Sequence, residues 1–160
     1  MAHDGTSVTI TRRLAAAPAR VFRAFVDGDD LAAWVWGSMA SRVDAHAEGR
    51  VGGRYWAYTD APEGMEDEWP SPRWGVMGVY AVLDEPDRLV YTIHWDGPVG
   101  YNQGDECVAD EVVVVDLVPA GGGAELTMRH LGIPDDGVSS AEHERGIEDM
   151  LDALAALVEG

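Results

Sequence analysis

Residues 140–160 constrain the fold more than any other part of this sequence. Their apolar side chains recur at the spacing of one helical face, at Ile147, Met150, Leu151, Leu154, Leu157 and Val158. Acidic residues fill the opposite face, at Glu142, Glu144, Glu148, Asp149 and Asp152. A helix with such a stripe has to bury it against another element. We therefore expect a C-terminal helix about 27 Å long, capped at its start by Ser139 or Ser140.

The element that covers this helix is expected to be a sheet. Alternating apolar and polar residues, separated by turn-forming residues, predict strands over 6–13, 41–46, 53–59, 73–83, 88–95, 111–118 and 124–131. Gly121–Gly123 has the composition of a hairpin turn. Two acidic connections, residues 60–72 and 96–111, are expected to form exposed loops near an opening.

Two short helices are predicted after the first strand. Pro18 suits the first position of one helix, and the helix stops at Asp27–Gly28. Asp29 or Asp30 is expected to cap the second helix. One sheet face and one helix stripe are buried together when the helix lies across the sheet. The predicted fold class is α+β: a helix-grip fold in which a curved antiparallel sheet of about six to seven strands wraps the C-terminal helix. Residues 1–160 are expected to form a single domain.

The charge of the chain excludes several classes of partner. With 29 acidic and 11 basic residues, the formal net charge is −18, which repels nucleic acids and anionic membranes. The sequence has no apolar leader and no apolar run of about 18 residues, so we expect a soluble, cytoplasmic protein. All 11 basic residues are arginine, which indicates a GC-rich bacterial genome or, alternatively, salt adaptation.

Metal and cofactor chemistry find little support in the sequence. Cys107 is the single cysteine, which excludes an intramolecular disulfide and a cysteine zinc cluster. The 5 histidines are scattered, and the adjacent Glu142 and His143 cannot chelate one ion together from a regular helix. We therefore expect no metal and no cofactor.

Side-chain parity indicates which residues could line a pocket under the C-terminal helix. In the strand 88–95, Tyr91, Ile93 and Trp95 share one face and His94 is expected to point outward. His130 shares its face with Met128, so it is either a polar anchor or general base for a ligand, or a core histidine. Strand 73–83 is apolar on both faces, which leaves open whether Trp74 or Met77 points inward. The candidate ligand-binding residues are Trp34, Trp36, Tyr55, Met77, Tyr91, Ile93, Trp95, Met128, His130, Ile147, Met150 and Leu151; ordinary core packing is the alternative role for all of them.

Four stretches resemble a known superfamily in their order and spacing. They are RRLAAAPARVFRAFVDGDDLAAWV, EPDRLVYTIHW, VVVVDLVPAGGGAELTMRHLG and HERGIEDMLDALAALV. Together they are similar to the START/Bet v 1-like (SRPBCC) superfamily, in the activator of Hsp90 ATPase homologue 1-like branch. The resemblance implies a helix-grip fold with a cavity between the last helix and the sheet that takes up something apolar. Members often have Trp directly after the glycine of the last helix; here Ile147 follows Gly146, which implies more room beneath the helix.

The function expected from these observations is binding of a small hydrophobic molecule, apolar or aromatic. The alternatives are a polyketide cyclase- or dehydratase-like enzyme with a pocket His or Tyr as acid–base, and a chaperone-related or stress-response interaction module. Binding ranks above catalysis because the sequence shows no second polar group paired with His130, and no catalytic residue is assigned. The sequence starts at the first strand, whereas the eukaryotic Hsp90 activator has a preceding domain, so a chaperone-activating role is not expected. A homodimer through an exposed sheet edge or apolar patch is left open.

Overall fold

The structure is a computed structural model, which describes residues 6–39, 42–60, 73–96 and 111–160. The two connections predicted as acidic loops therefore lie almost wholly outside the described residues. The described elements are β1 (Thr6–Leu14), α1 (Pro18–Val26), α2 (Gly28–Trp34), the 3-10 turn η1 (Gly37–Met39), β2 (Val43–Ala47), β3 (Arg54–Asp60), β4 (Arg73–Asp84), β5 (Arg88–Asp96), β6 (Glu111–Ala120), β7 (Gly123–Ile133) and α3 (Ser139–Glu159).

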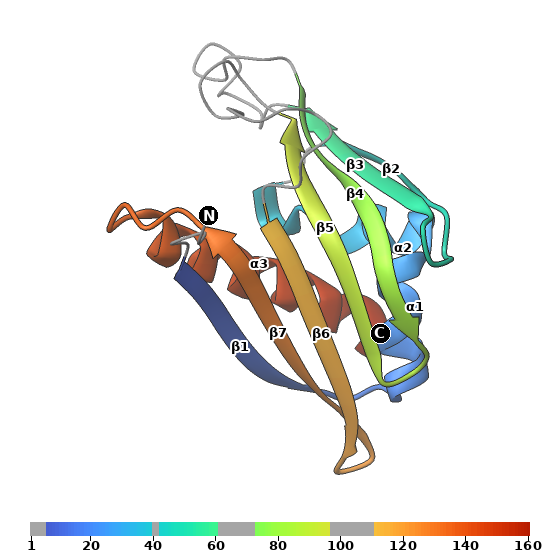
Figure 1. The fold of residues 1–160 in the computed structure, drawn as a ribbon. Coiled ribbons are helices and arrows are strands. Elements are labelled where there is room, and N and C mark those ends of the chain that lie inside the picture. The colour runs from blue at the N-terminus through green and yellow to red at the C-terminus, as the bar shows by residue number, and fades with distance from the viewer. Residues whose placement is uncertain (1–5, 40–41, 61–72, 97–110) are drawn as a thin grey trace.

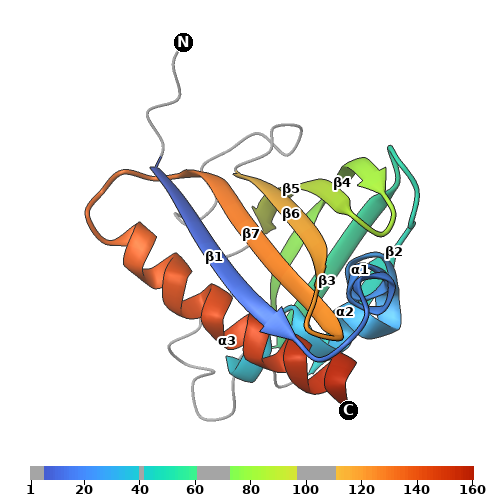
Figure 2. The same cartoon turned by 90° about the horizontal axis from the view of Figure 1, so that it is seen from below.

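The described strands form one antiparallel sheet in the order β1-β7-β6-β5-β4-β3-β2. The sheet curves around α3, and α1 and α2 lie near the C-terminal end of α3 (Figures 1 and 2). The predicted α+β helix-grip fold is confirmed, and the strand bounds differ from the predicted ones by only a few residues. The alternation of apolar and polar residues was informative because one face of each strand is buried.

The helix caps differ from the predicted ones. The side chain of Asp27, rather than Asp29 or Asp30, caps α2 by accepting the backbone N–H of Asp30 at 3.0 Å. At the start of α3, the Asp136 carboxylate accepts the backbone N–H groups of Val138 and Ser139 at 2.9 and 2.7 Å. The predicted serine cap of α3 is therefore wrong. The backbone turns at Gly137, with φ of 77°, and this turn brings the earlier carboxylate to the helix end.

The apolar stripe of α3 is buried as predicted, with Ile147, Leu151, Leu154 and Val158 as its most buried members. The backbone of α3 approaches β1, η1 and α2 more closely than the central strands β4, β5 and β6. Polar contacts reinforce these edges, because Arg12 of β1 pairs with Glu148 and Asp152, and Ser38 of η1 donates to Asp149. The helix is thus held along its sides. None of the helices in the described ranges is long and apolar enough to cross a membrane.

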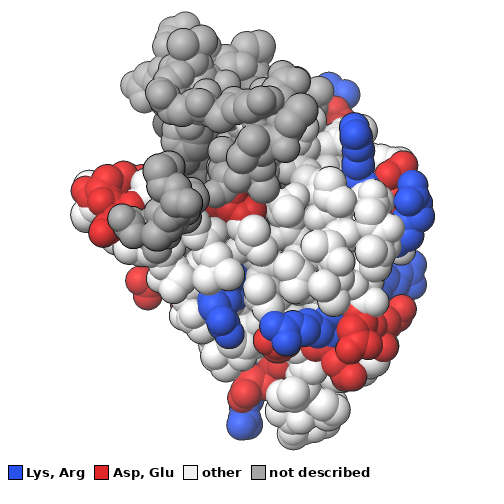
Figure 3. Space-filling view, viewed as in Figure 1, with Lys and Arg blue, Asp and Glu red and all other residues white. Residues whose placement is uncertain are grey.

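The outer face of the sheet, turned away from α3, is largely uncharged over the central strands (Figure 3). Trp56, Val79 and Val82 are exposed on β3 and β4. Trp56 stacks on His46 of the edge strand β2, with ring centroids 5.9 Å apart. A largely uncharged face is unusual on a chain whose formal net charge is −18. A homodimer through it, or through a sheet edge, stays a prediction.

Candidate functional site

Four polar side chains from the sheet and the last helix meet at one end of the core. Glu111, at the first position of β6, accepts hydrogen bonds through Oε1 from Trp95 Nε1 at 3.2 Å and from His143 Nε2 at 2.6 Å. Its other oxygen, Oε2, lies 3.4 Å from His130 Nδ1. Glu111 and His130 are 4% and 3% exposed. We call Trp95, Glu111, His130 and His143 the Glu111 cluster.

Hydrogen-bond partners fix the charges in this cluster. His143 Nδ1 lies 2.8 Å from the carbonyl oxygen of Ser139, and its Nε2 lies against the Glu111 carboxylate. Both partners are acceptors, so both ring nitrogens carry a proton and His143 is an imidazolium. Burial by itself would raise the pKa of Glu111, but the hydrogen bonds from His130 and His143 lower it to about 2. Burial alone would lower the pKa of His143. The hydrogen bond to Glu111 and the negative charge of Glu111 raise the pKa of His143 instead.

The Glu111–His143 pair predicts a characteristic dependence of stability on pH. The pKa of Glu111 falls from 4.5 to about 2 on folding, so its contribution, about 3 kcal/mol, is complete above pH 4.5 and lost as the pH falls toward 2. The pKa of His143 is raised from 6.5, so its contribution is complete below pH 6.5 and lost as the pH rises through the raised value. The pair should therefore stabilise most between pH 4.5 and 6.5.

Urea unfolding across this pH range tests the expectation. The difference in free energy of unfolding between the natural protein and Glu111→Gln should peak inside the window and shrink on both sides. His46→Gln, in an exposed position on β2, serves as the control and should give a difference that is small and flat. A flat difference for Glu111→Gln would show that the pair is not charged as assigned.

Aromatic side chains border the cluster on the helix side of the sheet. The ring centroids of Trp95 lie 6.2 Å from Trp36 and 6.3 Å from His143. Tyr91 lies 6.2 Å from Phe25 and 5.6 Å from Tyr55. Burial raises the pKa of both tyrosines above its usual value of 10, so both hydroxyls are protonated at neutral pH. The Tyr55 hydroxyl donates to the Thr92 carbonyl at 2.6 Å.

Most of the candidate ligand-binding residues gather on this side of the sheet. The apolar ones either belong to the buried core or pack against it: Trp36, Tyr55, Tyr91, Ile93, Trp95, Met128, Ile147, Met150 and Leu151. His130 is a buried polar residue on the same face as Met128. Trp34 lies in the core between α1 and α2, where its Nε1 donates to the Ala24 carbonyl at 2.8 Å and its ring meets Phe25 edge-on at 4.8 Å.

Met77 lies on the other face of the sheet from the remaining candidate residues, and His94 is more buried than an outward-pointing residue usually is. Met77 pairs directly across the sheet with Trp56 and His94, so it lies on the outer face, away from Trp95. Trp74, which pairs with Thr59, takes the helix side. His94 lies on the outer face, opposite to Trp95, as expected, but only 5% of it is exposed. Parity gives the face of a residue but not what covers that face.

With this geometry established, comparison with known proteins decides the family. The sequence profile of the family described as "Activator of Hsp90 ATPase homolog 1-like protein" matches residues 15–159. The chain belongs to this family. The resemblance seen in the sequence is thereby confirmed, and the fold is of a kind that commonly binds hydrophobic ligands. The chain matches no curated protein.

Solved structures of bacterial proteins share the fold over nearly the whole chain. A protein from Chromobacterium violaceum is 28% identical, with a TM-score of 0.75, covering 97% of this chain and 99% of its own. A protein from Silicibacter pomeroyi described as AHSA1 is 24% identical, with a TM-score of 0.71 and coverage of 96% and 98%. A protein from Aeromonas hydrophila described as AHSA1-like is 20% identical, with a TM-score of 0.69 and coverage of 96% and 92%. The last two show similarity of fold alone.

Sequence reasoning missed two members of the Glu111 cluster in this family member. The sequence pattern predicts Glu111 as the start of a strand and His143 as a residue of the first turn of the last helix, without a link between the two. Signals for both exist in the sequence. Glu111 has the same strand parity as the buried Val113 and Val115, and His143 precedes Ile147 by four residues, which puts both on one helical face.

The described residues contain no group of three His, Cys, Asp or Glu side chains that could hold a metal ion. In the Glu111 cluster, both histidines are directed at the carboxylate itself, so their nitrogens do not converge on a common point outside it. The cluster can instead hold a proton on His130 Nδ1, which leaves Nε2 as an acceptor or a base. Cys107 lies outside the described residues.

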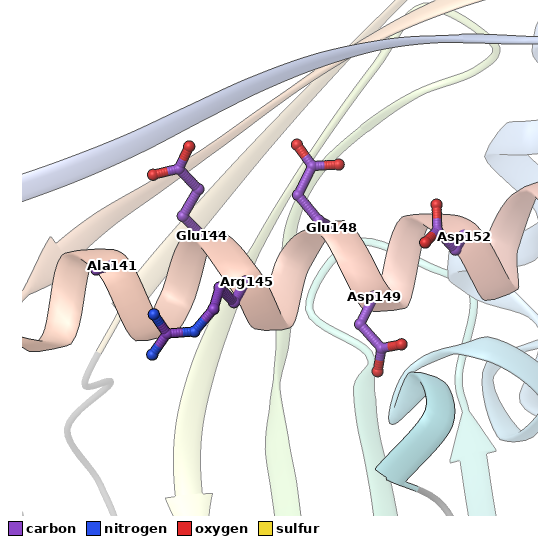
Figure 4. A pocket seen from close by; sticks show the side chains of 6 residues that line it. All are labelled: Ala141, Glu144, Arg145, Glu148, Asp149 and Asp152. Atoms are coloured by element: carbon purple, nitrogen blue, oxygen red, sulfur yellow. The ribbon is translucent and has the colours of Figure 1, made fainter.

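A separate surface hollow of about 490 Å³ runs along the exposed side of α3 (Figure 4). Its lining is Ala141, Glu144, Arg145, Glu148, Asp149 and Asp152. Two of these carboxylates, Glu148 and Asp152, pair with Arg12. None of the candidate ligand-binding residues lines this hollow, so it is distinct from the region around the Glu111 cluster.

Proposed function

We propose that this protein binds a small apolar or aromatic molecule between α3 and the inner face of the sheet, with the Glu111 cluster at the polar end of the ligand. One observation carries the proposal: a fixed set of buried polar groups lies among aromatic side chains. Small-molecule sites have this composition, because apolar walls supply affinity and a few polar groups set orientation. Trp36, Tyr91 and Trp95 are only partly buried and supply ring surface for contact.

Two further features support the proposal. The family's fold is of a kind that commonly takes up hydrophobic ligands. The close backbone approaches of α3 are to β1, η1 and α2, so side chains rather than backbone fill the distance to the central strands. Because contacts with β1, η1 and α2 hold α3 along its sides, a small ligand can fit between the middle of the helix and the central strands. Ile147 lies on this buried stripe.

Native mass spectrometry and thermal-shift measurements with a panel of apolar and aromatic compounds test the proposal. A compound that binds, added at a free concentration a hundred times its Kd, should raise the free energy of unfolding by about 2.7 kcal/mol. Ile147→Phe, which adds a ring beneath α3, should weaken binding at least tenfold. Glu144→Phe adds the same ring on the exposed side of α3 and should leave binding unchanged.

Circular dichroism establishes that both variants are folded before binding is compared. Added volume in a packed core costs about 1–3 kcal/mol, so a reduced Tm is expected for Ile147→Phe. Undiminished binding by a folded Ile147→Phe protein would contradict the proposed location of the site. The absence of any bound compound across the panel would contradict the binding function.

A further inference from the structure

The second ring nitrogen of His130, Nε2, is a buried polar atom. Nε2 is enclosed, and it has no hydrogen-bond partner within the part of the chain that the structure describes. The other nitrogen, Nδ1, faces Glu111 Oε2 at 3.4 Å. A buried polar group that makes no hydrogen bond costs about 1–3 kcal/mol. Such an atom is therefore a point where a bound ligand could restore a hydrogen bond.

The neighbours of His130 decide whether this atom donates or accepts. An ionised carboxylate is only an acceptor, so the proton of a neutral His130 is on Nδ1, directed at Glu111. His143 already supplies the cation that balances Glu111, because both of its nitrogens face acceptors. A second charge on His130 would place two cations against one carboxylate and leave an N–H unsatisfied in the core. Nε2 therefore has a lone pair and can only accept.

The charges around the cluster exclude an anionic ligand head. Glu111 and His143 together are neutral. None of the arginines whose side chains the structure describes is buried, and the two half-buried ones on β1 and α1, Arg12 and Arg20, are paired with acidic residues. A carboxylate entering the inner face would meet no free cation among the described side chains, and the formal net charge of −18 would repel it on approach.

We propose that the ligand is an aromatic molecule with an uncharged hydroxyl group, which donates its hydrogen to His130 Nε2. The inference rests on the proposed function and narrows it to one ligand class. The rings of Trp36 and Trp95 beside the cluster supply faces and edges for an aromatic body. Carboxylic acids and ethers of the same shape are selected against, because the first have a charge without a partner and the second have no hydrogen to donate.

Four naphthalene probes separate these possibilities on the full chain at pH 7: 2-naphthol, 2-methoxynaphthalene, naphthalene and 2-naphthoic acid. Isothermal titration should give an affinity for 2-naphthol at least tenfold higher than for the other three. In His130→Phe this advantage should disappear, while the affinities for naphthalene and the methyl ether stay within about threefold. His94→Phe replaces a second buried histidine, on the opposite face of the sheet, and should retain the full preference.

The results of this titration test the proposed ligand class separately from the proposed binding function. Binding of all four probes with equal affinity, or a preference for the acid, overturns the inference and leaves the proposed function standing. Failure of every probe to bind overturns both. If His130→Phe does not fold, long-range 1H–15N spectra of the natural protein give the answer: the proton of His130 should be on Nδ1, and the Nε2 resonance should shift with 2-naphthol but not with its methyl ether. A proton on Nε2 overturns the inference.

Discussion

Replacement of Glu111 with alanine should lower the free energy of unfolding by about 3–5 kcal/mol, which corresponds to a Tm lower by roughly 6–20 °C for a chain of this size. The variant leaves the His143 imidazolium in a half-buried position without its counter-ion and removes the acceptor of the Trp95 indole N–H. Loss of one partner from a buried ion pair is far more costly than loss of the whole pair, because the remaining charge stays desolvated. Urea unfolding at pH 6, where the pair is fully charged, measures the loss.

Two companion variants sharpen this experiment. Glu125→Ala removes a carboxylate that lies 3.6 Å from Arg13 at the surface of β7, and it should change the stability by no more than about 1 kcal/mol. The double variant Glu111→Leu with His143→Leu removes both charges and should recover part of the stability lost in Glu111→Ala. Equal losses for Glu111→Ala and Glu125→Ala would contradict the buried pair.

Trp34→Ala is expected to destabilise the protein by a similar amount, about 3–5 kcal/mol. Trp34 is 1% exposed, its ring contacts Phe25, and its indole N–H satisfies the Ala24 carbonyl. The variant leaves both a cavity and an unpaired carbonyl between α1 and α2. Chemical unfolding monitored by circular dichroism gives the size of the loss without relying on tryptophan fluorescence.

Trp56→Ala is the matched control, since the same side chain is deleted from the outer face. Trp56 is 38% exposed and stacks on His46. Its loss should cost less than the loss of Trp34, by at least about 1 kcal/mol, because more than a third of its side chain is already in water. A cost for Trp34→Ala as small as that for Trp56→Ala would mean that Trp34 faces an open pocket rather than the closed core.

The strands and α3 could be predicted from the sequence because each has one buried face with a regular period. The Glu111 cluster could not be assembled in the same way. Parity tells that Trp95, Glu111 and His130 each point inward, but not that β5, β6 and β7 are neighbours in the sheet. A cluster whose members are up to 48 positions apart, from residue 95 to residue 143, depends on strand order and register, which local patterns do not contain.

The positions of Met77, the cap of α3 and the burial of His94 also depend on contacts between elements, which a local sequence pattern does not contain. Strand β4 is apolar on both faces, so its pattern gave no direction for Met77, and only the pairing with Trp56 and His94 fixes it. The cap of α3 depends on the backbone turn at Gly137, which decides whether a serine or the earlier Asp136 reaches the helix end. The burial of His94 depends on which side chains pack over the outer face of the sheet, and strand parity does not give this.

The position of β1 in the sheet has a consequence for the time course of folding during synthesis. β1 is an edge strand, and its partner in the sheet is β7, so residues 6–14 wait for residues 123–133 before they can pair. Arg12 and Ala15 then meet α3 through Asp152 and Glu159, which follow still later. Because a ribosome produces the chain from its N-terminus, the first strand stays without its partner until residues 123–133 have been made. We expect the nascent chain to remain sensitive to protease in residues 6–14 until β7 has emerged, and the native fold to form only after α3 has been made.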